Sequence, residues 1–81
     1  MLRYYNKEKR TMPTIEEIKE HRIIVVLNGD HAGETLYVSN YSDSGDFLDC
    51  CDSNGTRITP TILRSNVRLA DFAEKLAFSN L

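Results

Sequence analysis

The sequence has no apolar run of about 18 residues, the length that a helix needs to cross a bilayer. Its first residues, Met-Leu-Arg-Tyr-Tyr-Asn-Lys, also lack the apolar centre of a secretory signal. Cysteine is scarce, and the two present, Cys50 and Cys51, are adjacent, so they cannot form the spaced framework of a disulfide-stabilised secreted protein. Together these absences predict a cytoplasmic protein.

The residue patterns of common catalytic and metal sites are also missing. A zinc site would require His21 and His31 to converge on both cysteines, and none of the usual ligand spacings is present. Residues 50–55 are similar to the first half of a calcium loop, but a cysteine stands in place of the first carboxylate. There is no Gly-rich phosphate loop, and His31 is a lone loop histidine without an assembled nucleophile. We therefore expect no enzymatic activity, no metal and no cofactor.

Basic residues are absent from a long central stretch of the chain. Residues 23–56 contain no Lys or Arg and have a net charge of −6, whereas residues 1–22 and 57–81 each have a net charge of +2. The six carboxylates of this stretch, which we call the acidic block, are Asp30, Glu34, Asp43, Asp46, Asp49 and Asp52. A surface of one sign attracts partners of the opposite charge, although a solvated face that keeps a small protein soluble has the same pattern.

With 81 residues, the chain is long enough for one hydrophobic core. Residues 1–12 are polar and basic without a sustained period, and we expect them to form a flexible arm. Residues 13–81, with ordinary proportions of hydrophobic and charged side chains, are expected to form a single globular domain. A domain of this size buries a limited apolar area, which leaves self-association, including a homodimer, open.

Local signals predict a short helix, several strands and a second helix. Thr14-Ile15-Glu16-Glu17 fits a capping box and predicts a helix over residues 15–21. Strands are predicted over residues 22–27, 34–41, 47–52 and 56–59, and over residues 61–69 after Pro60. Asn54-Gly55 predicts a type I′ hairpin turn. The fold class is therefore α+β, a small antiparallel β-barrel or curled sheet of four to five strands with a helix on either side in sequence.

The last two predicted elements have expected faces. In residues 61–69, alternation places Leu63, Val67 and Leu69 inward and Arg64, Asn66 and Arg68 outward. In the final helix, apolar residues at helical spacing predict a buried face made of Leu69, Phe72, Ala73 and Leu76.

The segment from Ile24 to Val38, Ile-Val-Val-Leu-Asn-Gly-Asp-His-Ala-Gly-Glu-Thr-Leu-Tyr-Val, resembles a KOW motif. In that family an apolar strand, a glycine, a short loop, a second glycine and another apolar strand form part of an SH3-like small barrel. The resemblance extends over residues 22–69 if the later hairpin supplies the remaining strands. It implies an SH3-like fold and a role in nucleic-acid machinery, although the loop carries Asp30 and Glu34 where a nucleic-acid binder favours cations.

Two functional hypotheses follow, both for a non-enzymatic binding module. In the first, the acidic block contacts a protein partner, such as a nucleic-acid-processing enzyme, by imitating a phosphate backbone, as small phage-encoded inhibitors do. In the second, the module binds nucleic acid directly. A basic strip of Arg57, Arg64 and Arg68 would contact phosphates, with Tyr37 or Tyr41 stacking on bases. The net acidity of the chain favours the first hypothesis.

Overall fold

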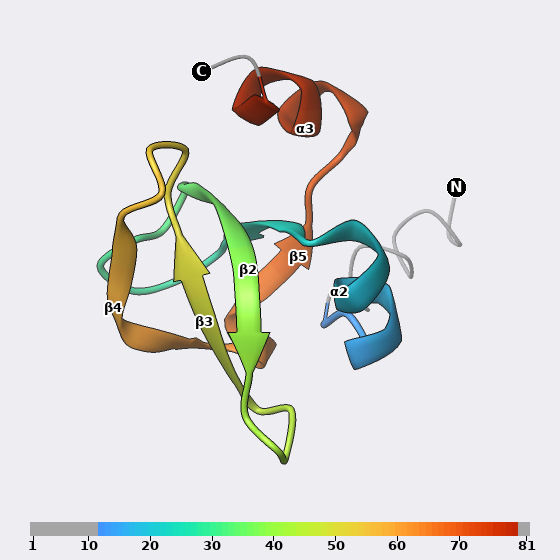
Figure 1. Ribbon diagram of the computed structural model, residues 1–81, viewed down its shortest axis with the longest axis vertical. Helices are drawn as coiled ribbons and strands as arrows, with labels where there is room; N and C mark the ends of the chain where they lie inside the picture. The colour runs from blue at the N-terminus through green and yellow to red at the C-terminus, as the bar shows by residue number, and fades with distance from the viewer. Residues whose placement is uncertain (1–11, 80–81) are drawn as a thin grey trace.

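The computed structural model describes residues 12–79 of the chain (Figure 1). Its elements are helix α2 (Ile15–His21), strands β1 (Ile23–Val26), β2 (Thr35–Tyr41), β3 (Phe47–Cys51) and β4 (Arg57–Leu63), a 3-10 turn η1 (Arg64–Asn66), strand β5 (Val67–Leu69) and helix α3 (Phe72–Ser79). The strands form one antiparallel sheet in the order β4-β3-β2-β1-β5. The expected α+β fold is confirmed, and the sheet is open, with β4 and β5 as its edges. The arm expected at residues 1–12 lies, apart from Met12, outside the described residues.

Helix α2 begins and ends as its sequence predicts. The Glu17 N–H donates to Thr14 Oγ1 at 3.1 Å, and the Thr14 N–H donates to Glu17 Oε1 at 2.8 Å, which completes the capping box. The helix ends at Arg22, whose backbone is left-handed with φ 65° and whose N–H donates to the Ile18 carbonyl. Because Arg22 Nη1 also donates to the Val38 carbonyl at 3.0 Å, the end of α2 is tied to β2.

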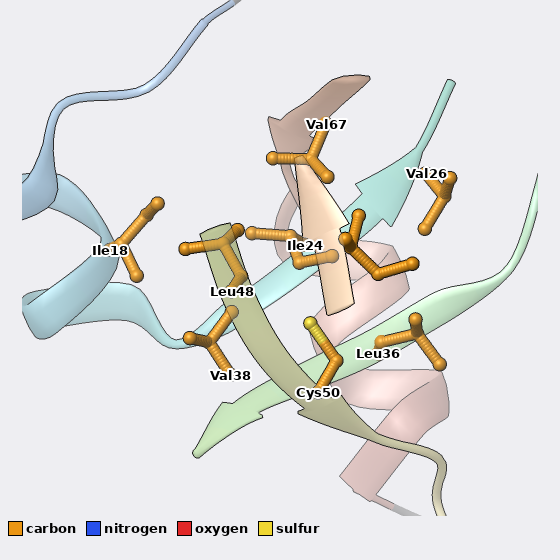
Figure 2. Close-up of a cluster of buried hydrophobic side chains, with 9 residues drawn as sticks. Ile18, Ile24, Val26, Leu36, Val38, Leu48, Cys50 and Val67 are labelled. Carbon is orange, nitrogen blue, oxygen red and sulfur yellow. The ribbon is translucent and has the colours of Figure 1, made fainter. Parts of the chain in front are cut away.

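The inner face of the sheet and one side of α2 enclose a single core (Figure 2). The buried cluster consists of Ile18, Ile24, Val26, Leu36, Val38, Leu48, Cys50, Ile62 and Val67. Ile62 comes from edge strand β4 and Val67 from edge strand β5, so both edges of the sheet curl toward the same core. Ile18 of α2 is fully buried and supplies the helix side of this cluster. Removal of this apolar surface from water is the main stabilising contribution to so small a domain.

The β3–β4 hairpin differs from the type I′ turn that Asn54-Gly55 predicts. A type I′ turn needs a positive φ at both central residues. Gly55 has a φ of 84°, but the φ of Asn54 is not positive. The Asp52 N–H donates to the Thr56 carbonyl at 3.0 Å, and the Gly55 N–H donates to the Asp52 carbonyl at 2.9 Å. The turn is therefore a three-residue loop with Gly55 in its left-handed position. Asp52 fixes it, because its Oδ1 accepts from the N–H groups of Asn54 and Thr56.

Residues 61–69 do not form one strand, which corrects the prediction. Leu63 ends β4, η1 turns the chain, and β5 then pairs with β1 at the opposite edge of the sheet. Leu63 is predicted to point inward, but it is 42% exposed. It lies opposite Phe47 on the outer face of the sheet. Val67 is buried and Leu69 packs against the core, as expected.

Helix α3 presents the opposite face from the one that its sequence predicts. Phe72 is 79% exposed and Leu76 is 51% exposed, and none of the eight residues of α3 is fully buried. A second capping box starts the helix, since the Glu74 N–H donates to Asp71 Oδ1 and the Asp71 N–H donates to Glu74 Oε1, both at 2.8 Å. Glu74 also binds Arg68 of β5 in a bidentate pair, which turns the Glu74 side of α3 toward the sheet.

Candidate interaction surfaces

The acidic block is divided between two ends of the sheet. Asp43 and Asp46 lie in the turn between β2 and β3, at the lower end in Figure 1. Asp30 and Glu34 lie in the loop that leads into β2, and Asp52 lies in the β3–β4 hairpin at the same end as the start of β2. Asp49, in the middle of β3, lies between the two groups. The sequence therefore does not fold into a continuous row of carboxylates.

Several carboxylates of the acidic block have partners within the chain. Asp49 pairs with Arg57 at 3.2 Å, Asp46 lies 3.9 Å from Arg64, and Glu34 lies 3.1 Å from His31 Nδ1. Among the described residues, Asp30 and Asp43 form no ion pair, and both are exposed. These two carboxylates are therefore the members of the block with the most freedom to meet a partner.

One hollow brings two members of the acidic block together. It has a volume of about 340 Å³ and lies between the start of β2, the β3–β4 hairpin and α3. Its lining residues are Glu34, Thr35, Leu36, Asp52, Ser53, Glu74, Ala77 and Phe78. Glu34 and Asp52 line one side, while α3 adds the carboxylate of Glu74 and the apolar wall of Ala77 and Phe78. Glu74 is not among the residues that the charge pattern predicts for a site, although the spacing of Asp71 and Glu74 is itself a capping-box signal.

Glu74 is an anchor as well as a lining residue. Its carboxylate accepts from Arg68 Nη1 at 2.9 Å and from Arg68 Nη2 at 2.7 Å. The bond to Arg68, together with the N–H of Asp71, lowers the pKa of Glu74 to about 2. The carboxylate is thus held in its charged form and is committed to a partner inside the chain.

The three arginines of the predicted basic strip are dispersed, and each is engaged. Arg64 lies in η1, where its Nε donates to the Gly45 carbonyl at 2.6 Å and its Nη1 donates to the Pro13 carbonyl at 2.8 Å. Arg68 lies in β5 and is bound to Glu74. Arg57, at the start of β4, pairs with Asp49 but remains 69% exposed at its side chain. The structure therefore does not bring these residues onto one strand.

The two candidate stacking residues lie on different faces of the sheet. Tyr37 is partly exposed on the outer face of β2, in register with Cys51, which is in turn in register with Arg57. Tyr41 packs against the core, because an irregularity between Val38 and Asn40 shifts the register of β2 before it. Only Tyr37 thus shares a surface with a candidate arginine.

The adjacent cysteines point to opposite faces. Cys50 is fully buried in the core, and burial raises the pKa of its thiol to about 12. Cys51 is partly exposed on the outer face. Within residues 12–79, no group of three or more His, Cys, Asp or Glu side chains lies close enough to hold a metal ion.

No protein-family model, no curated protein and no solved structure matches this chain. Over the part of the chain that the structure describes, neither helix has the length and apolarity that crossing a membrane requires.

Proposed function

We propose that this chain is a non-enzymatic protein-binding module of SH3-like, KOW-type architecture that contacts its partner through the acidic block. Residues 12–79 contain eleven Asp and Glu residues but six Lys and Arg residues, which gives this part of the chain a net charge of −5. A surface with this excess attracts a basic protein surface and repels nucleic acid.

The observation that supports the proposal is that several cationic side chains make contacts within the fold, whereas two carboxylates of the acidic block are exposed. Arg22 and Arg64 donate to main-chain carbonyls, Arg68 binds Glu74, and Lys75 donates to His21. These cations make contacts within the folded chain, and Arg68 is also neutralised by the carboxylate of Glu74. Within residues 12–79, the exposed carboxylates of Asp30 and Asp43 form no ion pair.

The partner class follows from the chemistry of the block. Basic grooves that accept carboxylates also accept phosphates, so the target is a protein that handles nucleic acid and the module competes for its groove. In this proposal the chain acts as an inhibitor or regulator of that protein.

The test removes charge from the block without disturbing its folded contacts. Asp30 and Asp43 are changed together to Asn, and the association rate is measured by surface plasmon resonance against a partner isolated with the wild-type chain and identified by mass spectrometry. We expect the association rate to fall about tenfold at low salt, with an unchanged melting temperature, because unpaired rim charges act mainly on encounter. Double-stranded nucleic acid added in solution is expected to displace the module from its partner.

A matched control removes the same charge elsewhere. Glu16 and Glu20, exposed on α2 and outside the acidic block, are changed together to Gln. This variant should retain the wild-type association rate. Equal effects of the two double variants would show that net charge, and not the acidic block, governs binding, and the proposal would then fail.

Direct binding of single-stranded nucleic acid is the second candidate, favoured by the position of Tyr37 beside Arg57 across Cys51. One stacked base contributes roughly 1–3 kcal/mol. In this case the isolated chain should bind an oligonucleotide with a shallow log–log salt slope of about −0.7 for a single phosphate contact. Changing Tyr37 to Ala or Arg57 to Glu should abolish that binding, and the change of Asp30 and Asp43 to Asn should not.

A further inference from the structure

Two large apolar side chains lie together on the outer face of β3 and β4. Phe47 and Leu63 are register partners on the two strands, and they are 46% and 42% exposed. Helix α2 packs against β1 and β5, and α3 packs beside β2. In the described part of the chain, neither helix therefore covers β3 and β4 (Figure 1). This apolar pair is left to contact either water or a partner.

The charges on the same face cancel each other. Asp49 lies on the same side of β3 as Phe47, because alternate residues of a strand share a face. Its Oδ1 lies 3.2 Å from Nη2 of Arg57, which comes from β4. Residues 12–79 as a whole have a net charge of −5, so two copies of the chain repel each other. The neutral face of β3 and β4 adds nothing to this repulsion, and a strongly charged partner gains no net attraction there.

The side chains of this face are self-complementary. Apolar Phe47 of β3 lies opposite apolar Leu63 of β4. Likewise, anionic Asp49 of β3 lies beside cationic Arg57 of β4. A two-fold axis that runs between the two strands places β3 of one copy on β4 of the other. Phe47 then packs on Leu63 of the second copy, and Asp49 meets Arg57 of the second copy. Such a contact uses the same surface on both copies and closes after two chains.

The edges of the sheet are less suited to pairing with a second copy. Pro60 lies in the middle of edge strand β4 and is exposed. Because proline has no N–H to donate, it interrupts the hydrogen bonds that an added strand would need. The other edge strand, β5, is three residues long. Contact between copies is therefore expected at the face and not at an edge.

We propose that the chain forms a homodimer through the outer face of β3 and β4, with its two-fold axis between these strands. A rise of about 3.4 Å per residue and a strand spacing of about 4.8 Å make this face roughly 17 Å long and 10 Å wide. This area is smaller than the interfaces of stable dimers, so the dimer is weak and exchanges with the monomer. Asp30 and Asp43 lie in loops outside this face, and the dimer is therefore independent of the proposed partner.

Analytical ultracentrifugation of the full chain, with a reductant present to keep Cys51 from forming a disulfide, measures the association. Between about 5 µM and about 500 µM, we expect the weight-average mass to rise from that of one chain toward that of two. NMR then locates the contact in a mixture of 13C-labelled and unlabelled chains. Isotope-filtered NOEs should join the Phe47 ring of one copy to the Leu63 methyl groups of the other. A mass that stays at one chain throughout would overturn the proposal.

Variants of apolar residues test whether this face forms the dimer. Phe47→Ser and Leu63→Ser should each raise the dissociation constant about tenfold or more, since each removes apolar surface from the contact. Phe72→Ser is the matched control, because Phe72 is 79% exposed but lies on α3. It should leave the dimer unchanged, and dispersed amide signals check that all three variants fold. A dimer lost in Phe72→Ser and kept in the other two would place the contact on α3 and contradict the proposal.

The ion pair tests the position of the axis. Arg57→Glu should weaken the dimer, because two carboxylates then meet on each side of the contact. Adding Asp49→Arg to this variant restores opposite charges both within and between the copies, and the dimer should recover. Failure of the double variant to recover would contradict the two-fold arrangement. NOEs from Phe47 to residues 1–11 of the same chain, unchanged by dilution, would show that this segment and not a second copy occupies the face, and the dimer would be overturned.

Discussion

Gly45 shows at the scale of a single residue how the β2–β3 turn is coupled to α2. Its φ is +80°, a conformation that an L side chain rarely adopts, and a Cβ at this position would lie 2.9 Å from Ile15 Cγ1. Gly55 in the β3–β4 hairpin has a similar φ of +84°, but a Cβ there would meet no atom within 4 Å. Both positions require a positive φ, but only at Gly45 would a Cβ also collide with a neighbouring side chain.

We expect the two alanine substitutions to differ for this reason. Gly55→Ala should cost about 1–2 kcal/mol, the strain of a left-handed alanine. Gly45→Ala should cost about 1–3 kcal/mol more, because Ile15 must also move. Urea unfolding curves of both variants measure the difference, and adding Ile15→Ala to the Gly45 variant should recover part of it in a double-mutant cycle. Equal losses of unfolding free energy in the two variants would show that Ile15 moves away from the new Cβ without a measurable cost in stability.

At the scale of elements, the pair between Arg68 and Glu74 sets both the orientation of α3 and its response to acid. The pKa of Glu74 is about 2 in the folded chain, below its ordinary value near 4.5. A carboxyl group with a lowered pKa adds stability that is fully present above its unfolded pKa and is lost as the pH falls through the folded one. The Glu74 contribution should therefore be complete above about pH 5 and should decline between pH 4.5 and pH 2.

Glu74→Gln tests this contribution. The variant should be less stable than the wild type at pH 7, and the difference in the free energy of unfolding should shrink progressively when chemical unfolding is repeated at pH 4, pH 3 and pH 2. Glu20→Gln, an exposed change on α2, provides the control and should show no such trend. A difference between wild type and Glu74→Gln that stays constant down to pH 2 would mean that the ion pair does not anchor α3.

The elements that were predicted correctly are those with local signals. Helix α2 follows from Thr14 and Glu17, which stabilise each other within one turn, and its expected bounds are confirmed. The facing of α3 could not be predicted in this way. Its apolar side chains suggest a buried face, but a tertiary contact with Arg68 decides which side meets the sheet. Residues 61–69 were misassigned because alternation continues through η1 and conceals the change of partner strand.

The members of the acidic block can be identified from the sequence, but their arrangement in space cannot. The absence of Lys and Arg from residues 23–56 identifies the carboxylates directly. That Glu34 and Asp52 face one hollow, whereas Asp43 lies at the other end, follows from strand pairing between residues distant in sequence. The internal use of Arg64 and Arg68 likewise depends on contacts with Pro13, Gly45 and Glu74, which no local pattern encodes.

For the whole molecule, the distribution of charge along the chain is uneven. Residues 1–11 carry a net charge of +3 and residues 12–79 a net charge of −5. The described part is anchored at its start by Arg64, which donates to the Pro13 carbonyl across 51 positions of sequence. The structural requirement for the N-terminal region should therefore begin at Pro13.

Removal of Met1 to Thr11 tests this boundary. We expect the free energy of unfolding to change by less than about 0.5 kcal/mol, as for surface changes without a buried partner. Arg64→Ala should cost about 2 kcal/mol or more, because the carbonyls of Pro13 and Gly45 both lose their donor. Thermal and urea unfolding measure both variants. A large loss on truncation would show that residues 1–11 belong to the fold.

The strand order also has a consequence for the route by which the chain reaches its fold. Strands β1 to β4 pair in sequence order, β1 with β2, β2 with β3 and β3 with β4, and form a meander. Strand β5, by contrast, pairs with β1, and the pairing of Ile24 with Leu69 joins residues far apart in the chain. Long-range pairing slows folding because loop entropy is lost before the contact forms. During synthesis, the meander from β1 to β4 can pair first, and β5 can complete the sheet only after residue 69 has left the ribosome.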